Sequence, residues 1–194
     1  MNTILPPIPA WDGLHPLIIH FPIALLLVAP ALVLAALLWR AQSRTLLTTA
    51  FALMFVGTLA SWMAVSTGHA AGELAEDGAV AAKAVIERHE ELAETTRNLF
   101  TGLTLAFGML VFAPLVMRRP LARMPSTALS LVFLAFYAGG ALFLVNTAHQ
   151  GGRLVHEFGV RAMMSSGQSA GGMVPGQAPG GSATSAEKEP GDRD

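Results

Sequence analysis

Six histidines are the residues of this chain best suited to chemistry: His15, His20, His69, His89, His149 and His156. The chain contains no cysteine, which excludes disulfides, zinc–thiolate sites, iron–sulfur clusters and covalent c-type haem attachment. A metal would therefore be bound by His, Met, Asp, Glu or backbone groups. Converging imidazoles of this kind suit haem iron, copper or zinc.

The spacing of the histidines excludes several familiar metal sites. The chain has no Glu-x-x-His pair of the di-iron carboxylate bundles and no His-Glu-x-x-His motif of the zinc proteases. His15 and His20 are separated by about 140° around a helix, so they cannot both face one site unless Pro22 distorts the turn. The pair Gly151-Gly152 is expected to break the helix between His149 and His156.

Four long uncharged runs are the elements that must position these histidines. The chain is 53% hydrophobic and 13% charged, whereas soluble domains contain about 25% charged residues. A membrane-spanning helix needs about 20 apolar residues, and we place spans near residues 17–39, 45–66, 98–117 and 126–147. The fold class is therefore all-α, an antiparallel four-helix bundle integral to the lipid bilayer.

The rest of the chain forms one loop and one tail. Residues 67–97 are expected to form the long loop, in which residues 79–96 are rich in Ala, Glu, Lys, Arg and Leu and predict a helix that continues into the third span. Residues 1–166 then form a single four-span domain. Residues 167–194 are rich in Gly, Pro and Ser and are expected to be a disordered tail.

The distribution of charge predicts the orientation in the membrane. The two short loops carry arginines and no acid: Arg40, Arg44, Arg118, Arg119 and Arg123. The segment from His69 to Arg97 carries seven acids against three bases. Because basic loops stay in the cytoplasm, we expect a multi-pass protein of the bacterial inner membrane with the acidic loop and both termini in the periplasm. The net charge of −1 offers no basic field for nucleic acid.

An antiparallel bundle brings the beginning of spans one and three and the end of spans two and four to the same membrane face. His20, His69, His89 and His149 are therefore predicted to converge at the periplasmic end as ligands of a metal or haem. Arg153 is expected to bind a haem propionate or a partner carboxylate. The residues expected to orient the ligands from around the site are Glu73, Glu90, His15 and His156.

Three segments of the chain resemble a bacterial membrane family catalogued as domain of unknown function 2231. They are His15-Pro-Leu-Ile-Ile-His-Phe-Pro22, Thr67-Gly-His-Ala-Ala-Gly-Glu73 and His149-Gln-Gly-Gly-Arg-Leu-Val-His156, and His89 fits the same pattern. The resemblance covers roughly residues 14–161 and implies four membrane helices. Similar domains occur beside c-type cytochromes in some bacteria, which implies a redox setting facing the periplasm. His156 stands where the family often has Tyr.

Two functions fit these observations. In the first, the protein is an electron-transfer subunit that binds haem b, or copper or zinc, and meets another membrane or periplasmic redox protein. In the second, it is a non-catalytic accessory or assembly subunit of a larger complex, without a cofactor and with structural histidines. The chain shows no set of nucleophile, base and orienting residue, so we do not expect an enzyme that acts on its own.

Overall fold

The computed structural model describes residues 11–76, 80–117 and 123–160. Its five α-helices are α1 (His15–Ile18), α2 (His20–Leu38), α3 (Ser43–Glu76), α4 (Lys83–Val116) and α5 (Arg123–His156). Short 3-10 turns cover Asp12–Leu14, Arg40–Gln42 and Val80–Ala82. This part of the chain contains no strand, so the all-α prediction is confirmed.

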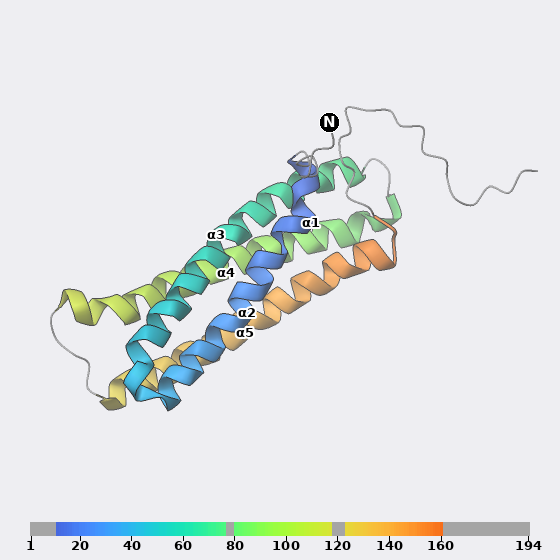
Figure 1. Cartoon of the computed structure of the whole chain (residues 1–194). Helices are drawn as coiled ribbons and strands as arrows, with labels where there is room; N and C mark the ends of the chain where they lie inside the picture. The colour runs from blue at the N-terminus through green and yellow to red at the C-terminus, as the bar shows by residue number, and fades with distance from the viewer. Residues whose placement is uncertain (1–10, 77–79, 118–122, 161–194) are drawn as a thin grey trace, which may run out of the picture.

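The four long helices form an elongated antiparallel bundle (Figure 1). Each helix packs against the next one in the chain, and α2 also packs against α5, which closes the ring. We call the end that holds α1, the beginning of α4 and the ends of α3 and α5 the histidine end. The opposite end is the arginine end, where Arg40 lies between α2 and α3 and Arg44 lies in the first turn of α3.

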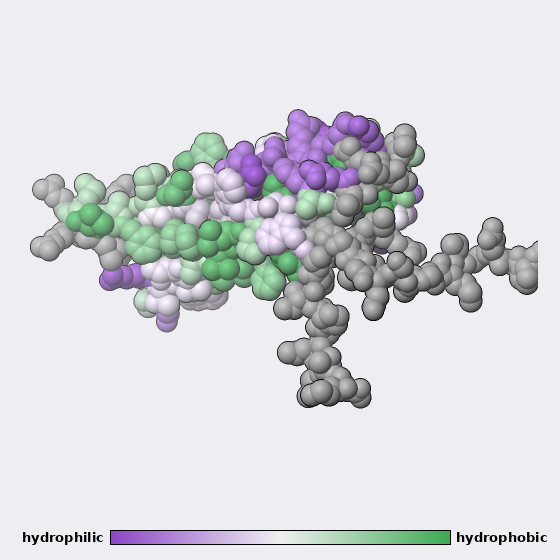
Figure 2. All heavy atoms as spheres, turned by 90° about the horizontal axis from the view of Figure 1, so that it is seen from above, coloured by the Kyte–Doolittle hydropathy of each residue, from purple (hydrophilic) through white to green (hydrophobic). Residues whose placement is uncertain are grey.

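The outer surface of the bundle is apolar along most of its length. Large apolar side chains point outward on every long helix, among them Leu38, Leu105, Phe136 and Leu142, each more than 60% exposed. Figure 2 shows an apolar belt, with hydrophilic residues gathered over the histidine end. All four helices are long and apolar enough to cross a membrane. An apolar surface of this extent requires lipid, so the four-span prediction is confirmed.

The helices at the histidine end are longer than the predicted spans. α3 continues to Glu76 and α4 begins at Lys83, so most of the expected loop 67–97 is helical. The predicted helical extension before the third span is confirmed. The expected break at Gly151-Gly152 is wrong, because α5 continues to His156. Each helical glycine costs only about 1 kcal/mol, and packing against α4 offsets that cost.

A buried hydroxyl compensates for a proline in the middle of α2. Pro30 has no N–H, so the carbonyl of Leu26, four residues earlier, loses its helical hydrogen bond. The Tyr137 hydroxyl on α5 donates to that carbonyl at 2.5 Å. The Tyr137 ring is 1% exposed and packs against Phe100 and Phe133. The core thus satisfies a polar group that lipid cannot.

Residues 167–194, predicted to be a tail, lie outside the described residues, and so does the predicted domain boundary at residue 166. The domain division therefore stays a prediction.

Candidate functional site

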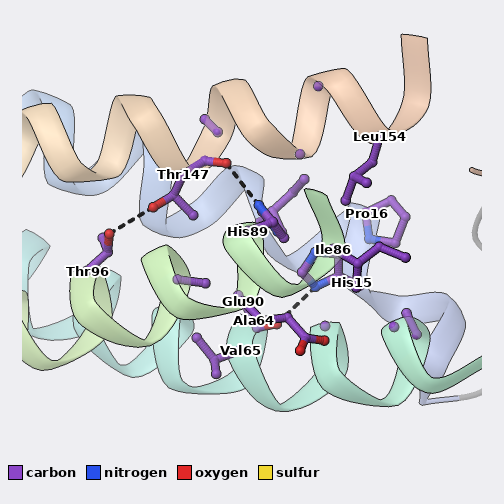
Figure 3. A pocket seen from close by; sticks show the side chains of 18 of the residues that line it. His15, Pro16, Ala64, Val65, Ile86, His89, Glu90, Thr96, Thr147 and Leu154 are labelled. Carbon is purple, nitrogen blue, oxygen red and sulfur yellow. Dashed lines mark hydrogen bonds between the residues drawn. The ribbon is translucent and has the colours of Figure 1, made fainter. Parts of the chain in front are cut away.

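A cavity of about 450 Å³ lies at the histidine end, between α1, α3, α4 and α5. Most of its lining is apolar, and its polar side chains include four of the six histidines: His15, His69, His89 and His156. Figure 3 shows His15 and His89 near its centre, with Glu90 and Thr147 nearby. Ligand pockets typically measure about 300–1,000 Å³ and combine apolar walls with a few polar groups, so this cavity is a candidate binding site.

His15 is fixed by two groups on α3. Its Nδ1 lies 2.9 Å from the carbonyl oxygen of Ala64 and 3.3 Å from the Thr67 hydroxyl. A carbonyl oxygen only accepts hydrogen bonds, so Nδ1 carries the proton and donates. The buried Thr67 hydroxyl in turn donates to backbone carbonyls one turn earlier. The α1 imidazole is therefore held against α3 in one orientation.

His89 is fixed in the same way between α4 and α5. Its Nδ1 donates to the carbonyl oxygen of Thr147 at 3.0 Å. The Thr147 hydroxyl lies 2.9 Å from the hydroxyl of Thr96, which follows His89 by about two turns of α4. Figure 3 shows both hydrogen bonds on one side of the cavity. The same pair of helices thus fixes the ring of His89 and its carbonyl partner.

The two fixed imidazoles face each other across the cavity. The ring centroids of His15 and His89 are 6.5 Å apart, and the ring planes are nearly perpendicular at 86°. With Nδ1 protonated, each neutral ring keeps its lone pair on Nε2. Among the described residues, neither Nε2 atom has a hydrogen-bond partner. Every fully buried side-chain nitrogen or oxygen among these residues does have a partner, so the two Nε2 atoms are not fully buried. Both Nε2 atoms are thus accessible from the cavity.

Two glycines make room for the two rings. A Cβ atom on Gly68 of α3 would lie 3.0 Å from Cε1 of His15, and a Cβ atom on Gly151 of α5 would lie 3.0 Å from Cε1 of His89. Both distances are shorter than ordinary van der Waals contacts, so a larger residue would push the ring away. The glycines of the Thr-Gly-His and Gln-Gly-Gly segments therefore set the positions of histidines elsewhere in the chain.

Two of the four predicted ligands lie outside the cavity. The side chains of His20 and His149 are exposed and do not line it. Since His15 faces inward, His20 lies about 140° away around the helix. His149 follows Thr147 by two residues, about 200° around α5, whereas Gly151 shares the inward face with Thr147. The positions of these residues around their helices therefore bring His15 close to His89 and leave His20 and His149 outside the cavity.

His69 lines the cavity, but its Nε2 is directed to Glu94 of α4 at 3.7 Å, and both side chains are more than 40% exposed. Glu90 and His156 also line the cavity, while Glu73 is exposed and does not.

Arg153 is not among the lining residues. It forms an i,i+4 ion pair with Glu157, whose carboxylate accepts from its Nε at 2.9–3.0 Å. That hydrogen bond holds the pKa of Glu157 below its usual value. Arg97 does line the cavity, with its guanidinium 4.3 Å above the Trp62 ring. Arg97, which the sequence argument did not select, is thus the arginine placed to reach a ligand there.

The described residues contain no group of three or more His, Asp or Glu side chains arranged to hold a metal ion. A bare zinc ion uses four ligands, at least three of them from protein in known site types. The four-histidine metal site expected from the sequence is therefore not assembled here. What the cavity offers is two fixed imidazole lone pairs, which suits a ligand that carries its remaining donor atoms with it.

Comparison with known proteins gives one match. The family model described as predicted membrane protein (DUF2231) matches residues 12–163. No curated protein and no solved structure matches the chain significantly.

Proposed function

This chain belongs to the DUF2231 family of predicted membrane proteins, and we propose that it is an integral membrane electron-transfer subunit that binds haem b between His15 and His89. One observation carries the proposal: two imidazoles on different helices face each other with ring centroids 6.5 Å apart. A metal atom bound by two Nε2 atoms at about 2 Å each holds ring centroids about 6 Å apart. The observed separation fits shared axial ligation.

The backbone carbonyls of Ala64 and Thr147 support this assignment. Histidines that bind metals generally donate their second ring N–H to a carbonyl or carboxylate, which fixes the tautomer and makes the ligating nitrogen more basic. Both histidines of the pair have such a partner, at 2.9 and 3.0 Å. This pairing also explains why Nε2, rather than Nδ1, is the nitrogen that remains for a ligand.

Haem fits the donor set better than copper or zinc does. A haem would carry most of the ligands of its iron in the porphyrin, so the protein would need to provide only the two imidazoles of His15 and His89. The apolar cavity suits the macrocycle, and the Arg97 guanidinium is placed to bind a propionate. When bound, the haem would supply one-electron redox chemistry. The carbonyls of Ala64 and Thr147 fix the two imidazoles that would hold the haem, and a second membrane or periplasmic redox protein would exchange the electron.

An absorbance spectrum of the purified protein tests the proposal. Expression with a haem supply is expected to give a Soret band, with separate α and β bands after reduction with dithionite, as for six-coordinate haem iron. Haem extracted into acidic acetone identifies it as non-covalent, in agreement with the absence of cysteine. A colourless protein that also fails to bind added haemin would contradict the proposal.

A second function has its own support. Through the same hydrogen bonds, His15 links α1 to α3 and His89 links α4 to α5. The two histidines therefore also stabilise the packing of these helices. In an accessory or assembly subunit, this stabilisation would be the only role of the two histidines. Colourless wild-type protein whose melting temperature falls in His15→Ala and His89→Ala would favour this alternative.

We further propose that the histidine end faces the periplasm of a bacterial inner membrane, with both termini on that side. The support is the clustering of arginines without acids at the opposite end. Alkaline phosphatase, active only in the periplasm, is expected to be active when fused after Gly78, between α3 and α4. Fusion after Ala122, between α4 and α5, is expected to be inactive. The reverse pattern would invert the orientation.

A further inference from the structure

A second cavity lies at the arginine end, remote from the histidine pair. Its volume is about 560 Å³, and residues from α2, α3, α4 and α5 line it. Part of the lining is polar: Arg40, Arg44, Ser43, Thr48, Ser126, Thr127 and Ser130. The remainder is apolar, with Leu47 and Leu110 among the side chains. A cavity divided in this way suits a ligand with one charged end and one apolar end.

The polar side of this cavity has a strong excess of positive charge. No Asp or Glu occurs between residues 13 and 72 or between residues 95 and 156, which includes every residue that lines the cavity. Arg40 and Arg44 therefore have no carboxylate partner there, and the Nη2 of Arg40 donates instead to the Thr127 hydroxyl at 3.4 Å. The first turns of α3 and α5 also lack acids, so their partial positive charge adds to that of the arginines.

The apolar side of the cavity continues into the surface that faces lipid. Phe112 of α4 and Leu129 of α5 both line the cavity and are 39% and 45% exposed. Hydrophobic side chains thus extend from the cavity to the outer surface of the bundle. An acyl chain can follow this path, whereas a free inorganic anion would gain nothing from it.

We propose that this cavity binds the headgroup of an anionic phospholipid. Arg40 and Arg44 pair with the phosphate, the hydroxyls of Ser43 and Thr127 donate to its oxygens, and an acyl chain lies along Leu47 and Leu110. Basic pockets between membrane helices are known to bind lipid headgroups of this kind. The site would retain lipid from the leaflet with which the arginine end is in contact. It does not depend on whether the histidine pair binds haem.

Native mass spectrometry of the purified full-length protein, titrated with phosphatidylglycerol or phosphatidylcholine, tests this site. Phosphatidylglycerol is expected to bind more tightly. Arg40→Gln or Arg44→Gln alone is expected to weaken its binding about fivefold, and the double variant about 25-fold, because each basic residue near an anionic headgroup contributes about that factor. The matched control is Arg88→Gln, which removes an exposed arginine paired with Glu91 at the histidine end and is expected to leave lipid binding unchanged.

Three results would overturn the proposal. The first is equal affinity for the two lipids, and the second is an equal loss in Arg88→Gln. The third is complete displacement of phosphatidylglycerol by inorganic phosphate at the same concentration, which would assign the site to a free anion. Each single arginine variant retains the other arginine that lines the cavity. An unchanged melting temperature in phosphatidylcholine will show that the variants are folded.

Discussion

His15→Ala is expected to remove the Soret band of the purified protein, whereas His20→Ala is expected to leave it unchanged. The two histidines lie five residues apart in the same apolar segment, but they differ in whether they line the cavity. His15 faces the cavity and its ring centroid lies 6.5 Å from that of His89, while His20 is exposed and outside the lining. In His15→Ala only the imidazole of His89 would remain to hold a haem, so haem affinity is expected to fall about tenfold or more, which corresponds to roughly 1.4 kcal/mol of binding free energy.

The second helix pair provides an independent repeat of the experiment. His89→Ala is expected to behave like His15→Ala, and the exposed His149 provides the control, because His149→Ala removes an imidazole at the same end of the bundle. Free imidazole added to His15→Gly is expected to restore the band, since it can occupy the vacated space. Loss of colour in His20→Ala, with retention in His15→Ala, would overturn the assignment of the ligands.

A structural role would give a different result in the same proteins. If the hydrogen bond from His15 to Ala64 only joins α1 to α3, then His15→Asn, which keeps a side-chain N–H, should restore the melting temperature of the alanine variant. It should have no effect on any spectrum. Recovery of the Soret band when free imidazole is added to His15→Gly would indicate that His15 is a haem ligand. Recovery of the melting temperature in His15→Asn would indicate that His15 only joins two helices.

The membrane helices were predictable because lipid imposes a simple rule on composition. Each span must be almost free of charge for about 20 residues, and four such runs are visible in the sequence. The helical extension at the beginning of α4 was predicted from composition, but the continuation of α3 to Glu76 was not. Beyond the apolar runs, the segment up to Glu76 and the segment from Lys83 have the charged, alanine-rich composition of soluble helices. The absence of charge identifies the part of a helix that crosses the membrane, but it does not show where the helix itself ends.

The histidine end was predictable from topology, but the identity of the facing pair was not. Sequence spacing showed that only one of His15 and His20 can face inward, and the choice depends on the rotation of α1 and α2 about their axes. The cost of placing a polar group in an apolar run favoured an inward His20. However, His20 lies at the beginning of α2, and its side chain is exposed on the outside of the bundle. The rotation is set by packing across the bundle, which the sequence does not display.

One signal in the sequence pointed to the pair of histidines that lie close together in the structure. Gly68 and Gly151 stand in segments that also contain His69 and His149, and a glycine inside a helix usually marks a close approach by another group. The groups that approach are His15 and His89. Gly68 and Gly151 therefore indicate the positions of histidines on neighbouring helices. Of the histidines beside them in the sequence, His69 is directed to Glu94 and His149 is exposed.

Tyr137→Phe is expected to lower the free energy of unfolding by about 1–3 kcal/mol, the usual cost of leaving a buried polar group without its partner. The hydroxyl of Tyr137 donates to the carbonyl of Leu26, which lacks a helical donor because residue 30 is proline. Phenylalanine keeps the ring contacts with Phe100 and Phe133, so the loss reports on the hydrogen bond. Reversible unfolding in mixed detergent micelles, followed by circular dichroism, gives the measurement.

A double-mutant cycle with Pro30→Ala separates this cause from a general loss of packing. Alanine at position 30 restores an N–H that can donate to the Leu26 carbonyl within α2. In that background, Tyr137→Phe should therefore cost less than in the wild type, with a coupling energy of about 1 kcal/mol. Equal costs in the two backgrounds would show that the hydroxyl acts on something other than the carbonyl that the proline leaves unpaired. Because the bond joins α2 to α5, the two helices that close the ring, the same cycle measures how strongly a proline in one membrane helix depends on its neighbour.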